Sequence, residues 1–274
     1  MARIDLARAL LRDCEKVYQT GNQSEDIPSK ENVISTYRSG VNQKKYTHMF
    51  FAKSVACWRH LQMILSATDD PVVSIGAGPC LCLFGWSWDR PPSSGQTVWA
   101  VDVLGWEAVR GLASYKALSR DVLGDAEFSF LDGLYFPPAC RPPQTQELDE
   151  IRPFQLDQLV PQSTVLLPFV LNHLVGLDSP VPKPSCVFDW LEEARSRAGR
   201  IVVADMPADR AGGFWTNIRS NLRAAGAPSV LTVDTIDDLA DAYSQRARWP
   251  ARRTSSYMRD FTALVGTDSG WRFL

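Results

Sequence analysis

Short β-rich runs recur along the chain from Pro71 onward, at spacings that leave room for helices between them. Several of these runs are apolar throughout, which is typical of strands covered on both faces. The candidate strands span residues 72–75, 97–102, 127–131, 164–168, 200–205, 229–233 and 261–266. Helical segments span residues 106–119, 187–198 and 213–225. This alternation predicts an α/β fold with a doubly wound, seven-stranded and mostly parallel sheet.

The first 70 residues have a helical pattern instead. Apolar residues recur near the helical period over residues 5–19, and residues 46–66 predict a longer and more buried helix. We therefore expect a helical N-terminal cap over residues 1–70 and a sheet domain over residues 71–274. Two irregular stretches, the proline-rich residues 135–162 and residues 237–260, are predicted insertions in the sheet domain.

Composition excludes several classes of protein. The 274 residues are 45% apolar, and the net charge of -2 gives no overall basic field that would attract nucleic acid or an anionic membrane. Only Cys80 and Cys82 lie close together among the six cysteines, so structural thiols are favoured over a metal site. The charged N-terminal segment lacks the apolar core of a signal peptide, and no run is long enough to span a membrane. We expect a cytoplasmic protein with no membrane partner.

A glycine turn ends the first predicted strand in the run VVSIGAGPC. In open α/β sheets, ligands bind beyond the carboxyl ends of the strands, where glycines let the backbone approach them. Gly76, Ala77 and Gly78 lie at that point. The alternative is a glycine turn that holds no ligand.

Two acidic residues end the next two predicted strands. Asp102 lies 26 residues beyond Gly76 and ends TVWAVD, where a carboxylate can accept hydrogen bonds from the two hydroxyls of a ribose. Asp132 ends the third strand, in FSFLDG, where its carboxylate can accept a hydrogen bond from the amino group of adenine. The alternatives are a solvated residue or helix cap at Asp102, and an ordinary Asp-Gly turn at Asp132 and Gly133.

Over residues 71–266 the chain resembles the class I S-adenosylmethionine-dependent methyltransferases, through VVSIGAGPC, AVD followed by Trp106, FLDG and the late strands. The resemblance implies a Rossmann-like fold and S-adenosylmethionine as the cofactor. It implies that the glycine turn packs against the methionine part, Asp102 holds the ribose, Asp132 holds adenine, and Trp106 packs against the adenosine. The implied cofactor-binding residues are Ser74, Gly76, Ala77, Gly78, Asp102, Val103, Trp106, Asp132, Gly133 and Pro168.

The chain departs from that family at two positions. The family often has an acid where this chain has Ser74, and often a third glycine where it has Cys80. A nicotinamide dehydrogenase is the competing interpretation, but its fingerprint requires glycine at Leu81. The last predicted strand, residues 261–266, is a candidate for the antiparallel strand that the methyltransferase sheet carries.

The acceptor side of the site is predicted at the end of the fourth strand, in LLPFVLNHL. Asn172 and His173 are the candidate catalytic residues, with His173 as a general base because its ordinary pKa suits proton transfer at neutral pH. The alternative for His173 is a capping or lining role. Methyltransferases that methylate amino groups of bases and glutamine carry an N-P-P-Y-type motif. The segment does not match that motif, which disfavours amino methylation of this class. Asp205, at the end of the fifth strand, either shapes the acceptor pocket or caps a loop.

Two further features leave the acceptor open. Aromatic residues of the cap, including Tyr46 and Phe50, either close over the ligands or belong to the core. The run RARWPARR suggests an RNA acceptor or a solvated loop, and its basic residues are Arg246, Arg248, Arg252 and Arg253.

The sequence therefore predicts a methyltransferase that acts on an unidentified acceptor, with a small molecule favoured. The alternatives are an RNA methyltransferase, an aminocarboxypropyl transferase of the nicotianamine-synthase type, and a non-catalytic binding or assembly protein on the same fold.

Overall fold

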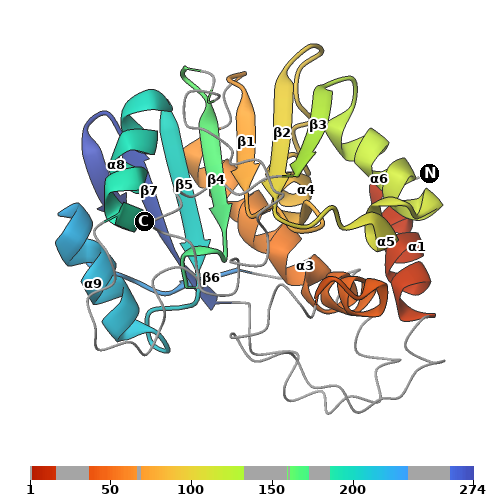
Figure 1. The fold of residues 1–274 in the computed structure, drawn as a ribbon, viewed down its shortest axis with the longest axis horizontal. Helices are drawn as coiled ribbons and strands as arrows, with labels where there is room; N and C mark the ends of the chain where they lie inside the picture. The colour runs from red at the N-terminus through yellow and green to blue at the C-terminus, as the bar shows by residue number, and fades with distance from the viewer. Residues whose placement is uncertain are drawn as a thin grey trace.

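The structure is a computed structural model that describes residues 2–16, 37–66, 69–132, 159, 161–172, 186–233 and 260–274. These residues form a central sheet with helices on both faces (Figure 1). The strands are β1 (Val72–Ile75), β2 (Thr97–Asp102), β3 (Glu127–Asp132), β4 (Thr164–Pro168), β5 (Arg200–Asp205), β6 (Leu231–Thr232), β7 (Asp260–Thr267) and β8 (Gly270–Phe273). The helices are α1 (Arg3–Glu15), α3 (Gly40–Leu65), α4 (Leu81–Trp86), α5 (Glu107–Arg110), α6 (Ala113–Leu123), α8 (Cys186–Arg197) and α9 (Gly212–Leu222).

The strand order is β3-β2-β1-β4-β5-β7-β6, with β8 paired to β7. Strands β1 to β5 run parallel to one another, so their carboxyl ends share one edge of the sheet. Strand β7 runs antiparallel to β5, β6 and β8. The predicted doubly wound, mostly parallel sheet is therefore confirmed, and so is the antiparallel strand near the C-terminus.

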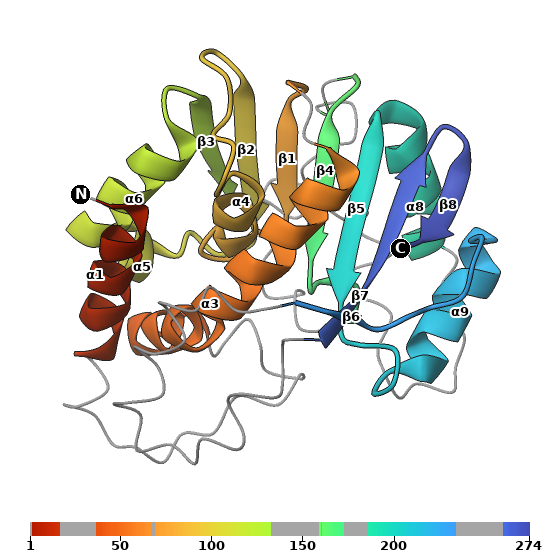
Figure 2. The same cartoon turned by 180° about the vertical axis from the view of Figure 1, so that it is seen from behind.

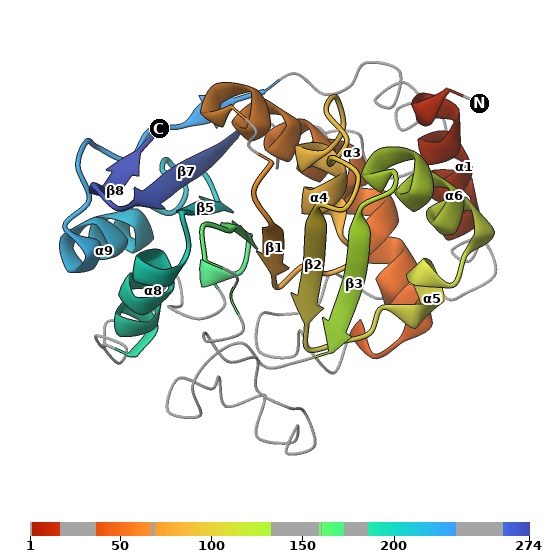
Figure 3. The same ribbon diagram turned by 90° about the horizontal axis from the view of Figure 1, so that it is seen from above.

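Each face of the sheet has its own hydrophobic core, because alternate residues of a strand point to opposite faces. Val72 of β1 belongs to a core cluster that also contains residues of α1, α3, α4 and α6. Its neighbour Val73 packs with residues of α8 and α9. Figure 2 shows α3 crossing the face of the sheet that carries the Val72 core, and Figure 3 shows the sheet between the helices of the two faces. Helix α3 thus shares one core with the sheet. The division of the chain at residue 70 stays a prediction.

Most predicted elements occur with small shifts, and strand β8 was not predicted. The predicted helix over residues 106–119 is split into α5 and α6 around Gly111, where an added Cβ would lie 2.8 Å from the Glu107 carbonyl oxygen. Strand β8 follows β7 through a turn at Asp268 and Ser269, and α4 is a short helix directly after the glycine turn.

Across the described ranges, no helix combines the length and the apolar character needed to cross a membrane.

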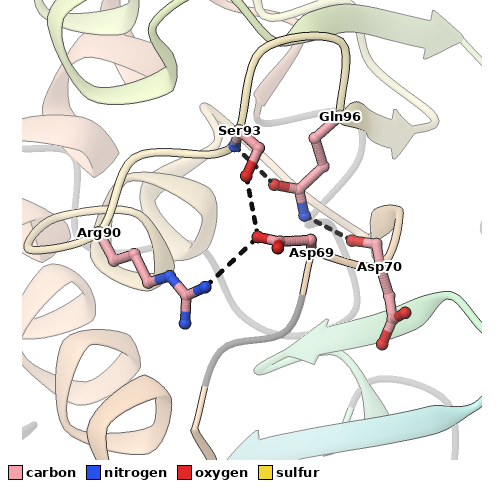
Figure 4. Close-up of polar contacts among 5 residues, drawn as sticks. All are labelled: Asp69, Asp70, Arg90, Ser93 and Gln96. Carbon is pink, nitrogen blue, oxygen red and sulfur yellow. Dashed lines mark hydrogen bonds and ion pairs between the residues drawn. The ribbon is translucent and has the colours of Figure 1, made fainter.

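A group of polar contacts lies at the amino edge of the sheet, opposite the carboxyl ends of β1 to β5 (Figure 4). The Gln96 side chain donates a hydrogen bond to the Asp70 carbonyl oxygen and accepts one from the Ser93 N–H (3.0 Å). The Ser93 hydroxyl donates to Asp69 (2.8 Å), which also pairs with Arg90 (3.3 Å). These bonds join the segment before β1 to the segment before β2.

Replacing Gln96 by alanine is expected to lower the free energy of unfolding by about 1 kcal/mol, because two hydrogen bonds of a half-buried side chain are lost. Urea unfolding measures the change. Arg90→Ala is the matched control, since its ion pair is exposed and is expected to contribute less than about 0.5 kcal/mol. A Gln96→Ala variant as stable as the control variant contradicts the assigned role.

Candidate functional site

The glycine turn lies between the end of β1 and the short helix α4. Gly76 and Gly78 have φ values of 70° and 54°, which glycine adopts without strain. The Gly76 and Ala77 N–H groups both donate to the Val101 carbonyl oxygen of the neighbouring strand, at 2.8 and 3.1 Å. The turn is therefore tied to β2 through its own backbone.

Asp102 completes that connection. It ends β2 and is 7% exposed. Its Oδ2 accepts a hydrogen bond from the Gly78 N–H (2.7 Å), and its Oδ1 accepts from the Leu104 N–H (2.9 Å) and the Trp106 indole N–H (3.2 Å). One buried carboxylate thus fixes the glycine turn and the loop after β2 together.

An aromatic cluster, Tyr37, Tyr46, Phe50 and Trp106, covers this part of the sheet edge. The Trp106 ring lies over Gly78, since a Cβ at Gly78 would stand 3.7 Å from it. The ring centroids of Tyr37 and Tyr46 lie 5.4 and 5.3 Å from that of Trp106, and Phe50 lies 4.6 Å from Tyr46. Helix α3 therefore places Tyr46 against the Trp106 ring that covers Gly78, with Phe50 packed on Tyr46.

Tyr46 lies within the aromatic cluster, where its hydroxyl group is buried. Burial raises the pKa of its hydroxyl well above the usual range, and Tyr37, Asp102 and Asp205 raise it further. The hydroxyl keeps its proton at neutral pH. It can donate a hydrogen bond at the sheet edge but cannot act as a base there.

The two positions at which the chain departs from the methyltransferase family flank the turn, one on β1 and one at the start of α4. Ser74 is fully buried, and its hydroxyl oxygen lies 2.9 Å from the Cys82 sulfur on α4. Cys80, where the family often has a third glycine, has φ 63°. The backbone therefore keeps the conformation that favours glycine, although the residue is cysteine. Burial raises the pKa of the Cys80 thiol to about 12.

A second polar pair lies at the ends of β4 and β5. Asp205 is fully buried, and Asn172 is 5% exposed. The Asn172 backbone N–H donates to Asp205 Oδ2 (3.1 Å), and its side-chain amide nitrogen donates to Asp205 Oδ1 (2.6 Å). The Met206 N–H donates to the same Oδ1 (2.8 Å). Asp205 thus holds the side chain of the candidate residue Asn172, which lies just beyond the end of the neighbouring strand β4.

The remaining predicted residues fall into two groups. Asp132 ends β3 directly beside Asp102 in the parallel register, Val103 follows β2, and Pro168 pairs with Ala204 at the end of β4. The others lie outside the described residues: His173, Gly133, Arg246, Arg248, Trp249, Arg252 and Arg253.

Two features of the site were missed from the sequence. Tyr37 was not singled out, although it packs against both Tyr46 and Trp106. Asn172 and Asp205 were considered separately, and their hydrogen bonds were not predicted. Their positions at the ends of consecutive predicted strands were the available signal, because neighbouring parallel strands bring such residues together.

The sheet topology decides the fold family. The order β3-β2-β1-β4-β5-β7-β6 combines a parallel sheet with an antiparallel β7 between β5 and β6. The chain has the fold of the class I S-adenosylmethionine-dependent methyltransferases. The glycine turn, Asp102 and the Asn172–Asp205 pair all lie at the ligand-binding edge of such a sheet.

No protein-family model matches the chain, and no curated protein sequence matches it. Similar solved structures include a SAM-dependent methyltransferase from Aquifex aeolicus, at 12% identity over 71% of this chain and 93% of that chain, with a TM-score of 0.40. The plantazolicin methyltransferase BpumL in complex with SAH is similar at 10% identity, over 94% and 99% of the two chains, with a TM-score of 0.41. A magnesium protoporphyrin IX methyltransferase from Synechocystis with bound SAM has 15% identity over 84% and 88%, with a TM-score of 0.33. No acceptor for this chain follows from them.

Proposed function

We propose that the chain binds S-adenosylmethionine at the glycine turn and transfers its methyl group to an acceptor. The observation that carries the proposal is the hydrogen bond from the Gly78 N–H to the carboxylate of Asp102. It places the buried carboxylate of Asp102, at the end of β2, beside a turn of two glycines and an alanine. A ribose hydroxyl and the cationic end of the cofactor suit those surroundings, because carboxylates accept hydrogen bonds and attract positive charge.

The same contacts disfavour a nicotinamide dinucleotide. A dinucleotide's pyrophosphate binds free backbone N–H groups at a glycine turn and helix N-terminus. Here Gly76 and Ala77 donate to Val101, and Gly78 donates to Asp102. A phosphate at this position would also face the Asp102 carboxylate. We therefore infer a ligand without phosphate.

The sulfonium of S-adenosylmethionine supplies an activated methyl group, so the protein mainly has to position donor and acceptor. Asp102 and the glycine turn would hold the adenosine and methionine parts. Trp106, which lies over Gly78, would pack against the adenosine. Asn172 lies at the end of β4, beside β1, where an acceptor would approach the methyl group.

A small-molecule acceptor remains the favoured proposal. The aromatic cluster supports it, since Tyr46 and Phe50 of α3 bring apolar surface to the sheet edge. An RNA acceptor rests on Arg246, Arg248, Arg252 and Arg253, which lie outside the described residues.

Calorimetric titration with S-adenosylmethionine and S-adenosylhomocysteine tests the cofactor proposal. We expect both to bind with roughly micromolar dissociation constants, equivalent to about -8 kcal/mol. NADH is the control ligand and is expected not to bind. Failure of both sulfur ligands to bind contradicts the proposal.

Incubation of cell extract with labelled cofactor then separates the kinds of chemistry. Gain of a labelled methyl group by an acceptor supports methyl transfer. Release of methylthioadenosine indicates aminocarboxypropyl transfer instead, and binding without any product indicates a non-catalytic protein.

A further inference from the structure

The side-chain oxygen of Asn172 is buried, and no donor among the described residues reaches it. Buried amide oxygens in folded proteins almost always accept a hydrogen bond, and leaving one unpaired costs about 1–3 kcal/mol. We propose that this oxygen accepts a hydrogen bond from the N–H or O–H group of the acceptor substrate that receives the methyl group, and that Asp205 is the positioning residue that orients it. This inference rests on the proposed methyl transfer and names the class of its acceptor.

Asp205 determines which atom of the Asn172 amide is left unpaired. An ionised carboxylate only accepts hydrogen bonds, so the amide nitrogen must face Asp205. The contacts agree, since the Asn172 backbone N–H and side-chain nitrogen both donate to Asp205, at 3.1 and 2.6 Å. This two-point hold prevents the amide from rotating. The oxygen is therefore directed away from Asp205, with its own hydrogen bond still to be made.

The pair lies close to the proposed cofactor site. Strand β4 pairs with β1, which carries the glycine turn, and β5 is the next strand. Burial chiefly raises the pKa of the Tyr46 hydroxyl on α3, and the charges of Asp102 and Asp205 both add to that rise, so both acidic strand ends lie within electrostatic range of this side chain. An acceptor between these elements would lie beside both the glycine turn and Asn172.

The chemistry of an amide oxygen defines the acceptor class. It can hold an acceptor whose nucleophilic nitrogen or oxygen carries a hydrogen, but it cannot take that proton. In the step, a lone pair of the acceptor atom forms a bond to the methyl carbon. The carbon–sulfur bond breaks with its electrons left on sulfur, which gives S-adenosylhomocysteine. The proton of the N–H or O–H passes to water. Carboxylate acceptors have no such hydrogen at neutral pH and are excluded.

The test compares wild type, Asn172→Leu and the matched control Asn221→Leu, in which an exposed asparagine of α9 is replaced. Each is incubated with cell extract and S-adenosylmethionine labelled in the methyl group. Asn172→Leu is expected to form at least about 10-fold less product, because an acceptor hydrogen bond is lost. Its affinity for S-adenosylhomocysteine, measured without any acceptor, is expected to change less than twofold. The control is expected to match wild type in both.

The bond formed identifies the acceptor. Methyl esters release methanol in mild base, whereas N-methyl groups and methyl ethers do not, and mass analysis distinguishes the latter two. A base-labile product overturns the inference, and so does undiminished transfer by Asn172→Leu. If wild type binds cofactor but transfers nothing, both this inference and methyl transfer are wrong. If wild type binds no cofactor, the proposed function fails at its first step.

If the Asn172→Leu protein does not fold, the Asn172→Asp variant provides the test instead. Two carboxyl groups at hydrogen-bond distance share one proton, which raises the pKa of the pair above the usual aspartate range. Below that pKa, the protonated Asn172→Asp side chain donates to Asp205 and still offers an oxygen, so transfer is retained. Above it, repulsion removes the carboxyl group from that position. Transfer that falls with rising pH only in this variant supports the inference, and a pH-independent result overturns it.

Discussion

Replacing Asp102 by alanine is expected to raise the dissociation constant for S-adenosylmethionine by at least about 100-fold, equivalent to about 2.7 kcal/mol. The substitution removes the acceptor proposed for the ribose. It also leaves the N–H groups of Gly78 and Leu104 and the indole N–H of Trp106 without their partner. Each unpaired buried donor costs about 1–3 kcal/mol, so the glycine turn is expected to lose its conformation. Calorimetric titration measures the affinity.

Asp125→Ala is the matched control, since Asp125 is an exposed aspartate after α6. It is expected to bind the cofactor as wild type does. Thermal unfolding of both variants separates loss of binding from loss of fold. An Asp102→Ala protein that stays folded and keeps its affinity within threefold contradicts the assignment of the site.

Strand positions were predictable because burial leaves a strong pattern. Strands β1, β2, β4 and β5 have the predicted bounds, and each is an apolar run that ends at a turn or a polar residue. Helix boundaries were less predictable. Helix α3 begins at Gly40, six residues before the predicted start at residue 46. The polar residue Gln43 is buried there because its side chain donates to the Tyr37 carbonyl oxygen and accepts from the Ala108 N–H. Periodicity does not register such tertiary contacts.

The candidate site was predictable in outline for a similar reason. Acids at the ends of consecutive strands must lie along one edge of a parallel sheet, so Asp102 and Asp205 could be placed from the sequence. Their partners could not. Asp102 bonds to Gly78 and Asp205 to Asn172, across 24 and 33 positions, and these contacts depend on strand adjacency and loop conformation. Only the structure shows which atom of the Asn172 amide faces Asp205.

Replacing Gly85 by alanine is expected to lower the free energy of unfolding by about 2–3 kcal/mol, because α4 crosses α3 at this glycine. A Cβ at Gly85 would lie 2.6 Å from the Val55 carbonyl oxygen and 2.7 Å from Cβ of Trp58. Neither atom can rotate away, since one belongs to the helix backbone and the other is fixed to it. The helices must separate, although Trp58 of α3 is fully buried at this contact. Thermal unfolding is expected to shift by roughly 4–10 °C.

Gly213→Ala is the matched control, because the same substitution in the first turn of α9 meets no atom within 4 Å. It is expected to stabilise the protein by about 0.5–1 kcal/mol, since alanine favours the helix over glycine. The two variants should therefore shift the unfolding temperature in opposite directions. If Gly85→Ala is as stable as wild type, the contact between α3 and α4 is looser than the structure indicates. Because α4 follows the glycine turn directly, its contact with α3 also holds the turn in place. Separation of α3 and α4 should therefore weaken cofactor binding as well.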